Sequence, residues 1–342
     1  MPPQTVAELG ERALIDRIRR RLTQPSFVHI GPGDDAAVLM PARGELEVLT
    51  VDAIVEGVHF DWRFVPPAAA GHRALAVNLS DLAAMGAAPR AALLSLVLPP
   101  SATVDDVDAF LGGFLALAEP SGTALVGGNI SRIEGPWVAS VTAIGSVRPR
   151  RILSRAGARP GDAIYVTGSL GAAAIGLRVL RAAADSDAAP GAVELHGATQ
   201  AAAERYLHPQ PRVRAGLLLG RNRAASSCMD LSDGLADGLT QIAEMSGVGM
   251  RVDATALPID DAVHAWHGTH GGDALTTAFG GGDDYELLFT VRASQRGRLR
   301  AVRQQLGALP VTRIGVVTKE RDLVVQTPDG ARTMPTGFEH YR

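Results

Sequence analysis

The sequence predicts a mixed α/β (α+β) protein of two domains. Both halves alternate short apolar runs of strand length with longer helical patterns. The chain has 342 residues, which is more than one domain usually holds. A segment rich in Arg, Pro and Gly, residues 148–161, interrupts the pattern without periodicity of its own. We therefore expect a first domain over residues 1–149 and a second over residues 150–342.

In the first domain, helices are indicated by apolar residues at helical spacing and strands by short β-type runs. Gly86 with Pro89 beyond it is a typical helix stop. The expected helices are 5–22, 68–85 and 104–117, and the expected strands are 36–40, 46–51, 124–126 and 137–147.

The second domain shows the same alternation, and it begins with a strand, the glycine turn 168–171 and a helix that ends near residue 184. A loop is expected over residues 185–197, and the polar stretch with His264, His267 and His270 reads as an exposed loop rather than a metal site. The remaining expected elements are strand–helix units at 226–245 and 278–291 and strands at 314–317 and 323–326.

Composition excludes several classes of protein. The net charge of −3 provides no basic patch for nucleic acid or for a membrane surface. Cys228 is the only cysteine, which rules out an internal disulfide and a cysteine-based zinc site. No uncharged apolar run approaches the roughly 20 residues that span a bilayer, and no signal peptide is visible, so we expect a cytoplasmic protein.

The basic residues are almost all arginine, and Lys319 is the only lysine. A Walker-type phosphate loop and a protein kinase both require a lysine in a defined motif, and neither motif is present. If the protein binds a nucleoside triphosphate, metal ions, arginines and backbone amides must neutralise its charge.

Acidic residues follow apolar stretches at five places along the chain. Carboxylates at strand ends and helix starts can converge on a cleft, and converging carboxylates repel one another unless a cation lies between them. Hard oxygen ligands favour Mg²⁺, which usually adds substrate phosphates to its shell. The five places are Asp34-Asp35, Asp52, Asn78 with Asp81, Asp230 with Asp233, and Asp283-Asp284 with Glu286. The sequence therefore predicts an enzyme that handles magnesium and phosphate.

Each of these motifs also has a purely structural interpretation. The pair Asp34-Asp35 is typical of a turn, and His59 is either a phosphate contact or a packed histidine. Asp81 flanks the apolar stripe of its helix. Ser232 suits a helix N-cap, although a helix start also presents free amides to an anion, and the glycine turn 168–171 is a second, weaker candidate for such a cradle.

Taken together, the motifs resemble those of the thiamine-monophosphate kinase family over nearly the whole chain, and their order and spacing make the match specific. The motifs are GPGDDAAV (31–38), VDAIVEGVHF (51–60), ALAVNLSDLAAMGA (74–87), RPGDAIYVTG (159–168), HPQPR (208–212), DLSDGL (230–235) and GGDDYEL (281–287).

The resemblance implies the two-domain fold of aminoimidazole ribonucleotide synthetase, in which the N-terminal domains of two subunits pair into a β-barrel, so a homodimer is expected. It also implies transfer of the γ-phosphoryl group of ATP to thiamine monophosphate, with several Mg²⁺ ions and no side chain acting as a general acid or base. Implied metal ligands are Asp35, Asp52, Asp81, Asn129, Asp230 and Asp233; implied ATP contacts are Thr50, Val51, Gly128, Arg155 and Ser232; implied substrate contacts are His59, Asp283 and Phe338.

Two residues depart from the family pattern near the expected ATP–metal site. Asn129 follows Gly127-Gly128, where the family usually has a metal-binding aspartate, so it offers a neutral carbonyl oxygen instead. Val51 replaces a residue that often carries a hydroxyl group. These changes bear on activity and metal number more than on the fold.

Two other functions remain open from the sequence. One is another ATP-dependent enzyme of the same superfamily; the hydrogenase-maturation type is disfavoured because it needs a C-terminal cysteine, which this chain lacks. The other is a catalytically reduced paralogue that binds nucleotide or thiamine phosphate, which Asn129 favours and the many retained aspartates disfavour.

Overall fold

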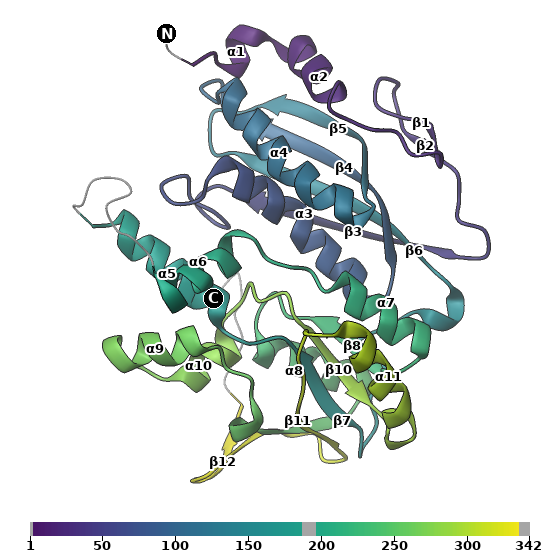
Figure 1. The fold of residues 1–342 in the computed structure, drawn as a ribbon, viewed down its shortest axis with the longest axis vertical. Coiled ribbons are helices and arrows are strands. Elements are labelled where there is room, and N and C mark those ends of the chain that lie inside the picture. Colours follow the sequence, from purple (N-terminus) through teal and green to yellow (C-terminus); the bar gives the residue numbers. More distant parts are fainter. Residues whose placement is uncertain (1–2, 187–195, 335–342) are drawn as a thin grey trace. The chain divides into compact units, whose positions relative to one another are not determined.

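A computed structural model describes residues 3–186 and 196–334 of the chain. The chain divides into two compact units. The first comprises Met1–Leu82 and Ala88–Arg148, and the second comprises Ala83–Ala87 and Pro149–Arg342. Each unit contains its own sheet with helices packed against it (Figure 1).

The first unit is built on a four-stranded sheet in the order β3-β6-β4-β5. β3 pairs antiparallel with β6, β6 pairs antiparallel with β4, and β4 pairs parallel with β5. The strands are β3 (Leu46–Val55), β4 (Ala88–Leu98), β5 (Ala124–Arg132) and β6 (Val138–Val147), and β1 (Val28–Ile30) with β2 (Val38–Leu39) form a separate pair.

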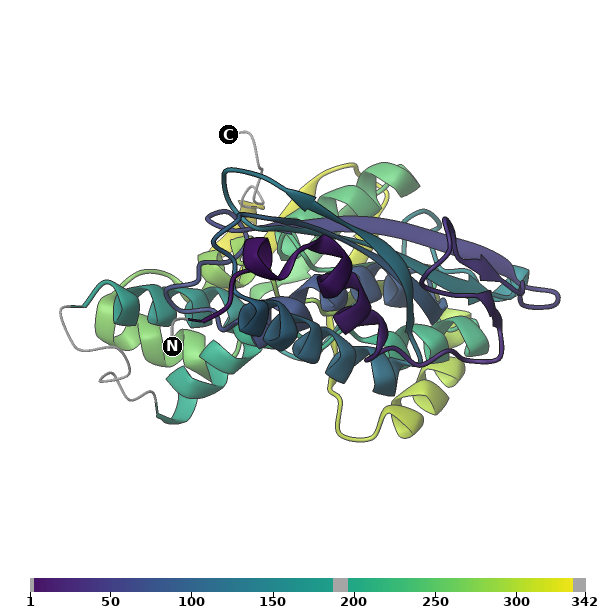
Figure 2. The same ribbon diagram turned by 90° about the horizontal axis from the view of Figure 1, so that it is seen from above.

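Helices α3 (Pro67–Ala84) and α4 (Val104–Ser121) cover one face of this sheet (Figures 1 and 2). Thr103 begins α4 by accepting a hydrogen bond from the Asp106 N–H, 3.1 Å away, as an N-cap should. These helices confirm the ones expected near residues 68–85 and 104–117. The single helix expected over residues 5–22 was wrong, because Gly10, with φ of 83°, separates α1 (Val6–Leu9) from α2 (Glu11–Arg19).

The other face of the sheet is open along β3. Side chains alternate between the two faces of a strand, so Thr50 and Asp52 point toward the helices and are half-buried. Leu49 and Val51 point the other way and are 64% and 62% exposed. Among the described residues, β3 pairs with a neighbour on one side only. The first unit therefore presents an apolar sheet face and a free strand edge.

The second unit is built on a seven-stranded sheet in the order β13-β12-β9-β11-β7-β10-β8, in which only the β12–β9 pair is parallel. Lys319 is exposed in the turn that joins β11 to β12. The strands are β7 (Ala163–Thr167), β8 (Ser227–Asp230), β9 (Gly249–Asp253), β10 (Leu287–Val291), β11 (Val311–Thr318), β12 (Leu323–Thr327) and β13 (Gly330–Thr333).

Helices cover both faces of the second sheet. Ile164 and Val166 of β7 pack on the side of α8, whereas Tyr165 between them packs with residues of α7 and α11. A further group of helices, α5, α6, α9 and α10, shares its own small apolar core. The helices are α5 (Ala172–Ala184), α6 (Gly197–Leu207), α7 (Val213–Asn222), α8 (Leu235–Ser246), α9 (Asp261–His270), α10 (Ala274–Gly280) and α11 (Arg296–Leu306), with 3₁₀ turns at Pro149–Arg151, Ala254–Ala256 and Ala293–Gln295.

Two local expectations for this unit were wrong. The stretch with three histidines is helix α9, not a loop, because Asp260 caps it by accepting a hydrogen bond from the Ala262 N–H at 3.0 Å. Ser232 is not the N-cap of α8, since that helix begins after Gly234, whose φ of 92° suits glycine. Within the described residues, no helix is long and apolar enough to cross a membrane.

Helices α3 and α4 pack closely at two glycines. A Cβ atom on Gly71 would lie 1.8 Å from the Phe110 carbonyl oxygen, and one on Gly113 would lie 1.8 Å from the Ala68 carbonyl oxygen. We expect Gly113→Ala to lower the free energy of unfolding by roughly 1–3 kcal/mol, because the two helices must separate to admit the methyl group. Urea unfolding measures this change.

The adjacent residue provides the matched control. A Cβ atom on Gly112 would meet nothing closer than the Arg21 guanidinium, at 3.4 Å. Gly112→Ala should therefore leave stability unchanged or raise it by up to about 1 kcal/mol through helix propensity. Equal destabilisation by both substitutions would show that the close approach at Gly113 is not the cause.

Candidate active site

In the first unit, hydrogen bonds link the middle of β3 to α3 around the predicted metal ligands. The strand expected over residues 46–51 continues to Val55, so Asp52 lies within it and not after it. The Thr50 hydroxyl donates to the Asp81 carboxylate. The Asp52 N–H donates to the Asn78 side-chain oxygen at 3.1 Å, and the Asn78 amide donates in turn to the Ala74 carbonyl at 3.0 Å. Asn78 is fully buried. The structure therefore brings Thr50, Asp52 and Asp81 together, with Asn78 holding the strand against the helix.

The structure does not place Asn129 beside them. Asp52 is in register with Val141, which is in register with Leu94 and then Gly128, so that row faces the helices. Asn129, one residue further on, faces the open side, and β5 lies three strand spacings from β3, roughly 14 Å. Its amide donates to the Ser131 hydroxyl at 2.8 Å. Val51, a predicted ATP contact, also faces the open side.

Gly128 is required where β5 meets β4. A Cβ atom at this position would lie 1.9 Å from the Leu94 carbonyl oxygen. Any side chain would push the two strands apart, so the backbone of the predicted ATP contact is fixed by its pairing with β4.

The two remaining predicted residues of the first unit lie in turns. The His59 Nδ1 atom accepts a hydrogen bond from the Val55 N–H at 3.1 Å and so closes the turn after β3. Asp35 is exposed, and its N–H donates to the Asp34 carboxylate at 2.9 Å. Both residues thus have structural contacts, and their predicted substrate and metal roles stay predictions.

In the second unit, the two acidic motifs pair with each other. The Asp283 N–H donates to the Ser232 carbonyl at 2.8 Å, and the Tyr285 N–H donates to the Leu231 carbonyl at 2.9 Å. Asp230, buried at the end of β8, and Asp233 belong to one of the paired segments, and Asp283 belongs to the other, the loop before β10. The structure therefore joins predicted metal ligands to a predicted substrate contact.

The second motif holds an unusual backbone conformation. Asp283 and Tyr285 have positive φ, 65° and 49°, a region that costs residues other than glycine about 1 kcal/mol or more. The Tyr285 hydroxyl donates to the Asp283 carboxylate at 2.8 Å. This tyrosine therefore fixes the direction of the Asp283 side chain as well as sharing its turn.

Of the other predicted contacts, Arg155 lies outside these clusters, whereas Ser232 belongs to the pairing with Asp283. Arg155 is exposed, and its guanidinium donates to the Gln241 side chain on α8. The Ser232 hydroxyl donates to the Asp233 carboxylate at 3.4 Å. Phe338 lies outside the described residues.

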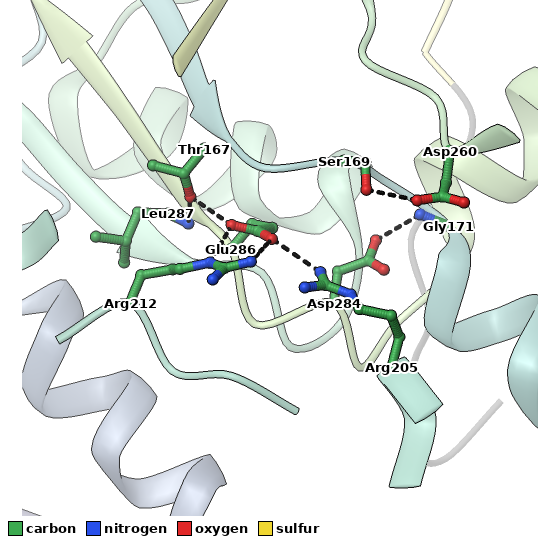
Figure 3. A network of polar contacts seen from close by, with 9 residues as sticks. All are labelled: Thr167, Ser169, Gly171, Arg205, Arg212, Asp260, Asp284, Glu286 and Leu287. Carbon is green, nitrogen blue, oxygen red and sulfur yellow. Dashed lines mark hydrogen bonds and ion pairs between the residues drawn. The ribbon is translucent and has the colours of Figure 1, made fainter. Parts of the chain in front are cut away.

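A buried charge network that the sequence did not predict is centred on Glu286, three residues after Asp283 in the chain (Figure 3). Glu286 accepts hydrogen bonds from Thr167 at 2.6 Å, from Arg205 at 2.8 Å and from the Arg212 Nε atom at 2.7 Å. Burial alone would raise the pKa of Glu286, but the hydrogen bond and charge of Arg212, together with Arg205, hold this pKa below its ordinary value. The motifs containing Arg212 and Glu286 were both visible in the sequence, but the pairing of these residues was not.

Asp284 occupies the glycine turn that was a candidate anion cradle. Its carboxylate accepts a hydrogen bond from the Gly171 N–H at 2.7 Å at the start of α5, so the protein's own side chain fills that position (Figure 3). Its second oxygen is buried without a hydrogen-bond partner in the described part of the chain. Burial raises the pKa of Asp284 to about 7.

The predicted metal ligands offer oxygen atoms, which are the type of donor that a hard cation prefers. Carboxylates, a hydroxyl group and amide oxygens are the ligands that Mg²⁺ and Ca²⁺ prefer, and the thiol of Cys228 is buried with a raised pKa. Within residues 3–186 and 196–334, however, no three His, Cys, Asp or Glu side chains form a group that could hold a metal ion. The predicted metal ligands therefore do not form a single cluster among the described residues, and their metal role stays a prediction.

Two family models match the chain. The AIR synthase related protein N-terminal domain matches residues 33–147, and the AIR synthase related protein C-terminal domain matches residues 159–327. With a two-unit α/β fold and acidic motifs at the strand ends, these matches define the class: an AIR synthase related protein.

Comparison with individual proteins shows to which family within this class the chain belongs. The chain is 39% identical over 335 residues to thiamine-monophosphate kinase of Salmonella typhimurium, covering 96% of each. It matches the crystal structure of thiamine-monophosphate kinase from Stenotrophomonas maltophilia K279a with a TM-score of 0.80 and 42% identity, over 91% of this chain and 95% of that one. The structure of AaThiL complexed with AMPPCP and TMP matches over 100% of both chains, with a TM-score of 0.76 and 31% identity. The chain belongs to the thiamine-monophosphate kinase family, which confirms the resemblance.

The raised pKa of Asp284 predicts a pH dependence of stability. Between about pH 4 and pH 7 the folded state keeps a proton that the unfolded state has lost, so stability falls as the pH rises through this window. Asp284→Asn mimics the neutral acid and removes this loss. We expect wild type to lose roughly 2–3 kcal/mol relative to Asp284→Asn between about pH 5 and pH 8, at about 1.4 kcal/mol per pH unit below the folded pKa.

Urea unfolding of both proteins across this pH range measures the difference. Parallel stability curves would contradict the assignment, because they would show that Asp284 is ionised in the folded state at every pH tested.

Proposed function

We propose that the protein transfers the γ-phosphoryl group of ATP to the phosphate of thiamine monophosphate, giving thiamine diphosphate and ADP. The observation that carries the proposal is the match over the whole of both chains to AaThiL, a relative that was solved with AMPPCP and TMP. The family membership established by relatives such as the Salmonella typhimurium enzyme supports the same reaction.

The chemistry suits a chain with almost no lysine. The acceptor is already a phosphate anion, so no strong base is needed to activate it. The main barrier is to bring two polyanions into line and to stabilise the charge spread over the transferred group. We propose Asp35, Asp52, Asp81, Asn129, Asp230 and Asp233 as the residues that hold Mg²⁺, which when bound would neutralise phosphate charge.

The described contacts support particular roles for the protein's own residues. Asn78 fixes the backbone at Asp52, Thr50 orients the Asp81 carboxylate, and Tyr285 orients Asp283. Orientation by fixed neighbours of this kind lowers the reorganisation required during phosphoryl transfer. The proposed ATP contacts are Thr50, Val51, Gly128, Arg155 and Ser232, and the proposed substrate contacts are His59, Asp283 and Phe338.

We also propose that the protein is a homodimer whose subunits pair through the open face of the β3-β6-β4-β5 sheet into a barrel. This pairing with a second copy is supported by the edge strand β3, which exposes the apolar side chains of Leu49 and Val51. A long apolar edge strand is rarely left uncovered. Asn129 faces the same side, so we propose that it serves a site completed by the second copy. The expected cytoplasmic location stays a prediction.

The test of the function is formation of thiamine diphosphate from thiamine monophosphate, ATP and Mg²⁺. Wild type should turn over, and Asp52→Asn should lower kcat about 100-fold or more while the protein stays folded, since a neutral amide holds a cation weakly. Asp105→Asn, which changes an exposed acid in the first turn of α4, should leave kcat unchanged.

Other outcomes of this assay distinguish the alternatives. Near-normal turnover by Asp52→Asn would contradict its metal role. If only Asn129→Asp makes product, the wild-type protein is a binder on a kinase scaffold. If neither makes product, thiamine monophosphate is not the acceptor.

The dimer is tested by Leu49→Glu, which places a charge on the open sheet face. We expect the molar mass measured by light scattering to fall to that of a single chain, because a buried unpaired charge opposes the apolar contact. Met245→Glu, on α8, changes an equally exposed apolar side chain (62%) and should leave the dimer intact. A monomeric wild type would refute the interface.

A further inference from the structure

The Glu286 network ties three separate parts of the second unit to one point. Thr167 is the last residue of β7, Arg205 lies in α6 and Arg212 immediately precedes α7. Their side chains converge on a carboxylate that is fully buried directly before β10 (Figure 3). A carboxylate with these donors has few positions available, because Glu286 is fully buried and its charge is strongly unfavourable there without its arginine partners.

The same residue also fixes the backbone next to the predicted substrate contact. The Glu286 carbonyl accepts a hydrogen bond from the Leu231 N–H at 2.9 Å, and the next N–H, that of Leu287, donates to the Thr167 hydroxyl at 2.9 Å. Glu286 is therefore held on both sides of its peptide as well as at its carboxylate.

The backbone that leads from Glu286 to Asp283 has the positive φ angles described above. Such angles persist only where the surrounding structure determines them, and Glu286 is the anchored end of this turn. The other end, Asp283, is attached through its N–H to the Ser232 carbonyl. A shift of Glu286 would therefore move Asp283 relative to Ser232 and Asp233.

We propose that Glu286, clamped by Arg205 and Arg212, is a positioning residue that sets the place of Asp283 for the thiamine phosphate substrate. This inference rests on the proposed function for the identity of the substrate. A buried charge cluster stabilises a fold no better than a packed apolar group does, whereas planar guanidinium groups give a carboxylate a defined orientation. The two arginines therefore fix the orientation of Glu286 at the end of this turn.

Hydrogen–deuterium exchange tests the positioning without any activity. In Glu286→Gln, the amides of Asp283 and Tyr285 should exchange about tenfold faster, while amides of β3 in the other unit should not change. Arg212→Lys, which keeps the charge and loses the two-point contact, provides a second variant if Glu286→Gln fails to fold. Arg214→Lys, in α7 but bonded to the Gln305 carbonyl, is the matched control.

Kinetics then separate positioning from ordinary stability. Glu286→Gln should raise KM for thiamine monophosphate about tenfold and leave KM for ATP within about twofold. In an Asp283→Ala background the same substitution should add little, because it acts through a side chain that is already absent.

The proposal is overturned if exchange at Asp283 and Tyr285 is unchanged, if the whole second unit exchanges faster to the same extent, or if the two substitutions have additive effects on KM. An inactive wild type would refute the proposed function, and the exchange result would still decide whether Glu286 positions this turn.

Discussion

The pairing of a fully buried glutamate with two arginines is the interaction on which the second unit's functional turn depends. Glu286 lies between the end of β7 and the start of β10, and the arginines reach it from α6 and the segment before α7. Because the arginines and Thr167 must all reach one carboxylate, β7, α6 and α7 have to end or begin at defined positions. Asp284, two residues earlier, binds the start of α5 differently, by accepting a hydrogen bond from the Gly171 N–H. The carboxylates of Asp284 and Glu286 therefore hold the ends of several elements together. Because Asp283 precedes them in the same turn, their positions restrict its conformation.

In the first unit, neutral side chains hold predicted metal ligands in place. A buried amide, Asn78, holds the middle of β3 against α3, and the Thr50 hydroxyl directs Asp81, the acid one turn further along the helix. Neutral hydrogen-bonding groups carry a smaller desolvation penalty than charges do. These contacts bring Asp52 and Asp81 together, and converging carboxylates of this kind suit a cation-binding site.

Much of this was predictable from the sequence. The helix at Pro67–Ala84 and the strand at Ala163–Thr167 were predictable because each is a largely apolar stretch, and the strand is buried on both faces. Local polar signals were less reliable: Ser232 resembled an N-cap and His264–His270 resembled a loop, and Gly234 and Asp260 decided otherwise. The Glu286 network was beyond prediction, since its members are separated by up to 119 residues. The sheet face on which Asn129 lies depends on strand register, which no local pattern reveals.

The exposed position of Lys319 in the turn between β11 and β12 has a practical consequence. The guanidinium groups that dominate this chain do not react with the mild acylating reagents that modify amines, and the thiol of Cys228 is buried. An amine-reactive fluorophore would therefore attach to one side chain, besides the chain's own α-amino group. The second unit thus carries a single amine-reactive side chain. It lies outside every motif proposed to bind ATP, substrate or metal.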